Sequence, residues 1–159
     1  CETVGHPSRL DTEYEQTMRS IMTKHEGPSH ADRDTDPAVK WLDKPEKHDY
    51  PAAASYLSLI AGPKAVNRAV KALREADTVS FKAKDLLRAA GLPLLPADDP
   101  DVAKELGRVR AGTALSPCLI IRGNNKAGTA ARIADGYHRV CASYHLSEDT
   151  VVPARIAGF

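Results

Sequence analysis

Cysteine is scarce in this sequence. Its three cysteines, Cys1, Cys118 and Cys141, form no Cys-x-x-Cys pair, and their odd number and wide spacing suit neither a disulfide framework nor a zinc site. We therefore expect a protein of the reducing cytoplasm, in which Cys118 and Cys141 are small buried apolar residues. A chain that begins with Cys1 leaves two alternatives open, which are residues lost upstream or a lipoprotein-type amino-terminal cysteine.

Long apolar runs and an excess of one charge are also missing. No apolar stretch approaches the roughly 20 residues that a membrane-spanning helix needs, and the amino terminus lacks the features of a secretory signal. The 22 Lys and Arg residues and 21 Asp and Glu residues give a formal net charge of +1. A dedicated nucleic-acid-binding protein usually has a strong basic excess, although a local patch is compatible with a balanced total. We expect a soluble protein with no membrane partner.

What is present is an ordinary globular composition, with 42% hydrophobic and 27% charged residues in a chain of 159. This length supports one medium-sized domain with an appended region. We divide the chain into a polar arm (residues 1–49), a helical pair (50–78) and an α/β domain (79–159). Within the arm, residues 11–24 predict a short helix, and Trp41 predicts an anchor that packs onto the domain.

The helical pair combines an apolar helix with an amphipathic one. Residues 50–61 are rich in helix formers and predict a mostly buried helix. Residues 63–76 follow the period of an amphipathic helix. Its polar face carries a row of cations that we name the basic stripe: Lys64, Arg68, Lys71 and Arg74. Such a stripe is either a solvated face or a surface that binds DNA or an acidic protein.

The region from residue 79 onward alternates between strand and helix patterns. The pattern predicts a fold of the α/β (α+β) class with a small mixed sheet. Two apolar stretches joined by a glycine-rich loop predict a hairpin. In chain order we expect a strand at 79–84, a short helical turn at 85–90, a helix at 100–110 capped by Asp99, strands at 117–121 and 130–134, a helix at 137–146 and a closing strand at 151–156.

The clearest chemical signal is the turn Asp135-Gly136-Tyr137-His138-Arg139. A glycine at the end of a strand allows a tight turn, after which the free amides of the next helix point at one place, where the helix dipole favours an anion. His138 and Arg139 can both donate hydrogen bonds to phosphate oxygens. Asp135 could hold a metal ion, orient a nucleophile or cap the helix.

In this order of elements, the turn resembles that of the ParB/sulfiredoxin superfamily over residues 79–156. Sulfiredoxins carry a nucleophilic cysteine where this chain has Tyr137, so their chemistry is not expected here. Chromosome-partition ParB proteins bind cytidine triphosphate with a Gly-x-Arg-Arg turn and continue into a helix-turn-helix, for which no module is evident. The ADP-dependent free-serine kinases are most similar, because their turn reads Asp-Gly-His-His-Arg.

The resemblance implies a nucleotide site at the turn, filled by a nucleoside triphosphate or diphosphate with Mg²⁺. It implies catalytic roles for Asp135 and His138. It also implies nucleotide contacts from Gly136, Tyr137, His138 and Arg139. The histidines outside the turn show no metal-ligand spacing, so we expect no resident metal site.

The resemblance also implies that the amino end of the helix at 100–110 borders the nucleotide. Lys104 and Arg108 share one of its faces at a spacing of four, and they are candidate phosphate or ribose contacts, with a solvated face as the alternative.

Two functional hypotheses follow from different classes. The first is a cytoplasmic nucleotide-binding protein, with NTPase and phosphotransferase as the candidate activities. The alternative is a non-catalytic regulatory module that contacts DNA or an acidic protein through the basic stripe. A nuclease would need a carboxylate cluster, and the acidic group at 98–101 instead predicts a helix cap. The polar arm also suggests docking on a neighbour, so a homodimer is a further expectation.

Overall fold

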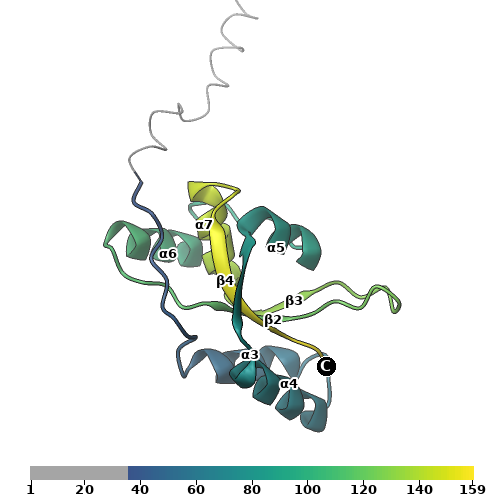
Figure 1. Ribbon diagram of the computed structural model, residues 1–159. Helices are drawn as coiled ribbons and strands as arrows, with labels where there is room; N and C mark the ends of the chain where they lie inside the picture. Colours follow the sequence, from purple (N-terminus) through teal and green to yellow (C-terminus); the bar gives the residue numbers. More distant parts are fainter. Residues whose placement is uncertain (1–35) are drawn as a thin grey trace, which may run out of the picture. The chain divides into compact units, whose positions relative to one another are not determined.

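The computed structural model describes residues 36–159 (Figure 1). Residues 37–159 form one compact unit. In it a four-stranded mixed sheet lies between two layers of helices, which confirms the predicted mixed α/β class with a small sheet. The predicted helix at residues 11–24 lies outside the described residues. No helix of the described part is both long and apolar enough to cross a membrane.

The sheet has the strand order β1-β4-β2-β3. β4 and β2 run parallel, while the β1–β4 and β2–β3 pairs are antiparallel. The predicted hairpin is therefore confirmed as β2 and β3, with Ile120 opposite Ile133. The strands are β1 (Thr78–Lys82), β2 (Cys118–Ile121), β3 (Arg132–Asp135) and β4 (Val151–Ala157). β3 thus starts two residues later than predicted, and it includes Asp135.

β2 is buried on both faces because helices cover both sides of the sheet. Side chains alternate between the faces of a strand. Cys118 and Ile120 belong to one core, and Leu119 and Ile121 belong to the other. The first core packs under α5 (Ala83–Ala90), α6 (Pro100–Arg110) and α7 (Tyr137–Leu146). Both α5 and α6 lie between β1 and β2 in the chain, where a short turn and one helix were predicted.

The predicted helical pair covers the second face of the sheet as α3 (Asp49–Leu57) and α4 (Pro63–Glu75). It shares a core with the strands, so residues 50–78 are part of the same compact unit as the sheet. α3 is half buried rather than mostly buried, and it ends four residues before the predicted limit. The amide of Ile60 donates to Leu57 instead of continuing the helical pattern, and Leu59 and Ile60 are exposed.

The local sequence explains where α6 begins. The Asp99 carboxylate accepts hydrogen bonds from the amides of Asp101 and Val102, which confirms the predicted cap of α6.

Trp41 packs against the first core. Its neighbour Leu42 donates an amide hydrogen bond to Leu115, so the predicted anchor is confirmed for this short segment.

Candidate functional site

The predicted turn lies where the start of β2, the end of β3 and the start of α7 meet. Gly136 has a φ of 109° and accepts a hydrogen bond from the Cys118 thiol at 3.7 Å. Burial raises the pKa of Cys118 to about 12, so the thiol stays protonated. Cys118 and Cys141 are both buried, as predicted, and Cys118 is a packing residue rather than a nucleophile.

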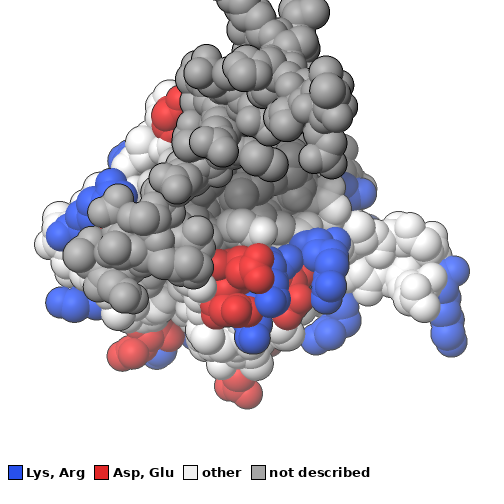
Figure 2. Space-filling view, turned by 90° about the horizontal axis from the view of Figure 1, so that it is seen from above, with Lys and Arg blue, Asp and Glu red and all other residues white. Residues whose placement is uncertain are grey.

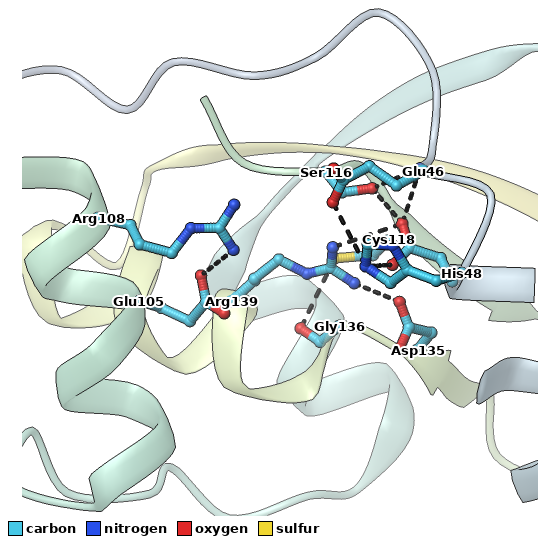
Figure 3. A network of polar contacts seen from close by, with 10 residues as sticks. Glu46, His48, Glu105, Arg108, Ser116, Cys118, Asp135, Gly136 and Arg139 are labelled. Atoms are coloured by element: carbon cyan, nitrogen blue, oxygen red, sulfur yellow. Dashed lines mark hydrogen bonds and ion pairs between the residues drawn. The ribbon is translucent and has the colours of Figure 1, made fainter. Parts of the chain in front are cut away.

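Arg139 lies inside the protein and faces two carboxylates, of which Figure 3 labels Asp135. Only 7% of the residue is exposed. Its guanidinium pairs with Asp135, four residues earlier, and its Nη1 atom lies 3.7 Å from an oxygen of Asp49. We name Asp49, Asp135 and Arg139 the buried triad. One cation thus faces two anions in a place where water screens their charges little.

Asp49 is the member of the triad that the sequence analysis missed. It is the first residue of α3 and only 3% exposed. The hydroxyl of buried Ser116 donates to its carboxylate, and the Glu46 amide donates to it at 2.9 Å. An acidic residue in the first turn of a helix is common because it complements the helix dipole, so no local pattern indicated a second role for Asp49.

The ionisation of Asp135 is unusual. Burial raises the pKa of its carboxyl above the ordinary value, Arg139 opposes this, and the charge of Asp49 raises it further. Two carboxylates around one guanidinium carry an excess negative charge, and a proton on Asp135 removes it. Asp135 is therefore suited to take up a proton.

Asp135→Asn is expected to be at least as stable as the wild type at pH 7. The raised pKa means that the contribution of Asp135 to stability is present below its ordinary pKa and lost as the pH rises through the raised value. Asparagine resembles the protonated carboxyl, and Arg139 keeps Asp49 as its partner. The difference between variant and wild type should vanish at pH values below the ordinary carboxyl pKa. Urea midpoints measured at several pH values test this.

The control for this prediction is Asp85→Asn, which removes an exposed carboxylate from its 3.0 Å pair with Arg88. Its effect should stay within about 1 kcal/mol at any pH because exposed pairs contribute little. A clear loss of stability in Asp135→Asn at pH 7 would contradict our view that the carboxylate form is disfavoured.

A cavity of about 250 Å³ opens beside the buried triad. It brings together six predicted site residues, which are Lys104, Arg108, Asp135, Gly136, His138 and Arg139. Four further lining residues were missed as members of a site: Glu46, His48, Asp49 and Glu105. Acidic and basic side chains therefore surround one hollow. On the face shown in Figure 2, the described acidic and basic side chains also lie side by side.

Two details of the predicted turn differ in the structure. Asp135 does not cap α7, because the cap residue is Gly136 and no side chain caps this helix; Asp135 pairs with Arg139 instead. Tyr137 is not among the residues that line the cavity. Its hydroxyl donates to the carbonyl of Pro93 at 2.5 Å, because the residue after the glycine faces the loop before α6.

The cations that line the cavity differ in their exposure and in the ion pairs that they already make. Lys104 is exposed, and the Arg108 guanidinium is 3.3 Å from Glu105. His138 is half-exposed, and its Nε2 atom lies 3.8 Å from an oxygen of Asp101. Lys104 and His138 can therefore contact a ligand without breaking the buried triad.

Two groups of side chains could hold a divalent cation. They are Glu46, His48 and Asp49, and Asp99, Asp101 and His138, and in each group the ligand atoms lie within 4.8 Å of one another. Carboxylate oxygens are the ligands that Mg²⁺ prefers. The spacing of the histidines in the sequence predicted no metal ligand at His48, but the fold places this exposed side chain beside two acids.

The basic stripe lies on α4 and does not line the cavity. Lys64, Arg68 and Lys71 are exposed. Arg74 is engaged within the chain, since its guanidinium carbon lies 4.2 Å from the centre of the Tyr50 ring. Arg74 is also exposed, so all four predicted cations are accessible to a partner.

Comparisons with known proteins give no relative for this chain: no family model, no curated protein and no solved structure matches it. The similarity to the ParB/sulfiredoxin superfamily therefore stays a prediction from the turn and its order of elements. The function has to be inferred from the geometry of the cavity.

Proposed function

We propose that the cavity beside Gly136 binds the phosphate groups of a nucleotide and that the domain is a ParB/sulfiredoxin-like NTPase or phosphotransferase. One observation carries the proposal: the N-terminus of α7, which no side chain caps, opens onto the same hollow as Lys104, His138 and Asp135. Helix N-termini and cations favour bound phosphate. A carboxyl that is poised to accept a proton lies next to them.

The size of the cavity supports a phosphate site rather than a pocket that encloses a whole nucleotide. Its volume of about 250 Å³ is below the roughly 300–1,000 Å³ of pockets that bury a drug-sized ligand. The base and sugar would then lie outside the hollow. A site of this kind selects for phosphate and leaves the choice of base to contacts outside the hollow.

The acids around the cavity also fit a nucleotide that carries Mg²⁺. Glu46 and Asp49 present oxygen ligands to the hollow. When bound, Mg²⁺ would neutralise part of the charge of the phosphate oxygens. Without Mg²⁺, the four carboxylates that line the hollow outnumber its three Lys and Arg cations, so we expect binding to require Mg²⁺.

In the proposed reaction, the hydroxyl of water or of an alcohol gives its proton to Asp135 while its oxygen forms a bond to the terminal phosphorus. The bond from this phosphorus to the bridging oxygen breaks, and the shortened nucleotide leaves with the electron pair. Burial raises the pKa of Asp135, which makes it a stronger base than an exposed carboxylate. Arg139 holds Asp135 in position, and Lys104 and His138 hold the phosphate.

Isothermal titration of the full chain with ATP, ADP, CTP and GTP, with and without Mg²⁺, tests the proposal. We expect saturable binding of at least one nucleotide, and an affinity about tenfold lower in Lys104→Ala and in His138→Ala, because each removes a charged or polar contact to phosphate. Both residues are accessible, so the fold should be unchanged. Arg139 is a poor choice for this test because its loss affects folding.

The matched control is Lys126→Ala, which removes an exposed lysine from the hairpin loop, away from the cavity. Its affinity for nucleotide should equal that of the wild type. No binding of any nucleotide, or an equal loss in Lys126→Ala, would overturn the proposal.

The alternative function is contact with DNA or an acidic protein, and the exposure of Lys64, Arg68 and Lys71 along α4 favours it. Binding through this surface would weaken steeply with added salt and would not respond to changes at His138.

A further inference from the structure

β1 is an edge strand whose outer side is open. It pairs with β4 on one side, and no described strand pairs with it on the other. All five of its residues are exposed. An edge strand presents unpaired backbone groups to any chain that can align with it. Two of the exposed side chains, Val79 and Phe81, are apolar and are 43% and 41% exposed.

The sequence of β1 is complementary to itself. Polar and apolar residues alternate symmetrically about Ser80, in the order Thr78-Val79-Ser80-Phe81-Lys82. If two copies pair antiparallel about a two-fold axis at Ser80, Val79 of each copy lies opposite Phe81 of the other. Cross-strand pairs of a β-branched and an aromatic side chain stabilise a sheet, and symmetry supplies two of them.

The charges at the two ends of β1 fit the same arrangement. Glu75 and Asp77 precede the strand, while Lys82 and Lys84 lie at and after its end. An antiparallel partner brings the acidic end of each strand to the basic end of the other. Parallel pairing would place like charges together. The two lysines also contact Asp149 of their own chain, at 3.1 and 2.8 Å, but the three side chains are 38–52% exposed and stay accessible.

We propose that the protein forms a two-fold symmetric dimer in which the β1 strands of two copies pair antiparallel, with Ser80 on the axis, and join the two sheets into one. The proposal does not depend on nucleotide binding, because β1 is not part of the cavity. Only position 80 lies opposite itself in this register. A charge placed there therefore meets an identical charge in the dimer.

Sedimentation velocity of the full chain over a range of micromolar concentrations tests the dimer. We expect the wild type to associate, and Ser80→Lys and Ser80→Glu each to associate about tenfold more weakly, because like charges directly opposite each other destabilise a strand pair. An equimolar mixture of the two variants should recover association, since unlike charges then face each other. Ser80 is exposed, so both variants should fold, and circular dichroism checks this.

The matched controls are Ser55→Lys and Ser55→Glu, which place the same charges on an exposed position of α3. They should associate like the wild type, alone and mixed. A wild type that stays monomeric, Ser80 variants that associate normally, or a mixture that does not recover would each overturn the proposal. An equal effect of the Ser55 variants would do so as well.

Discussion

Arg139→Met is expected to lower the free energy of unfolding by about 3–5 kcal/mol, because it leaves two buried carboxylates without their cation. Asp49 and Asp135 both face the guanidinium, and Asp49 is 3% exposed. Methionine fills much of the volume, so the loss should reflect charge more than packing. Urea unfolding followed by the fluorescence of Trp41, the single tryptophan, measures it.

The pH dependence and a matched substitution separate charge from packing in this variant. The deficit should shrink as the pH falls, because a proton on the Asp135 carboxyl, whose pKa burial raises, removes a negative charge that the missing cation balanced. The double variant Arg139→Met with Asp135→Asn should recover part of the loss at pH 7. In Arg108→Met, which breaks the partly exposed pair with Glu105, the loss should be below about 1 kcal/mol. A deficit in Arg139→Met that is constant with pH would show that packing is responsible.

The burial of Arg139 also shows where sequence reasoning succeeds and where it stops. The turn, the cap of α6 and the hairpin rest on residues close together in the chain, so local patterns predicted them. The sequence placed Arg139 beside a phosphate, as its position in a first helical turn suggests. The structure adds a partner that the sequence did not reveal: Asp49 is 90 positions away (139 − 49 = 90) in a helix of the opposite layer. No local pattern encodes such a contact.

Helix ends show the same limit on a smaller scale. The apolar run from Tyr50 to Ala61 predicted one buried helix, but its last four residues form the turn that carries the chain to Pro63. Apolar composition indicates which residues tend to be buried. It does not indicate where the chain must turn, and here that point depends on where α4 begins. Likewise, Lys104 and Arg108 were predicted as site residues because they share a helix face. Glu105 could not be predicted in this way, because the sequence does not show which face of α6 meets the cavity.

Gly136→Ala is expected to destabilise the protein by about 3 kcal/mol, because a side chain at this position has neither an allowed conformation nor space. The φ of 109° lies in a region that residues with a Cβ rarely adopt, and this strain costs about 1–3 kcal/mol. An added Cβ would lie 2.5 Å from the Cys118 sulfur and 3.0 Å from a nitrogen of Arg139. Overpacking of this kind adds about 1–3 kcal/mol. Chemical unfolding of the variant measures the sum.

Two further variants separate the two causes of the expected destabilisation, which are the positive φ and the lack of space for a Cβ. Gly91 also has a positive φ, of 62°, but an added Cβ meets nothing within 4 Å, so Gly91→Ala should cost only about 1 kcal/mol. Cys118→Ala removes the sulfur and should make Gly136→Ala less harmful in the double variant than in the single one, a coupling that a double-mutant cycle measures. Strict additivity would mean that the Cys118 sulfur plays no part in the need for glycine at this position. A coupling would instead show that the glycine is needed so that the turn can pack against the buried thiol.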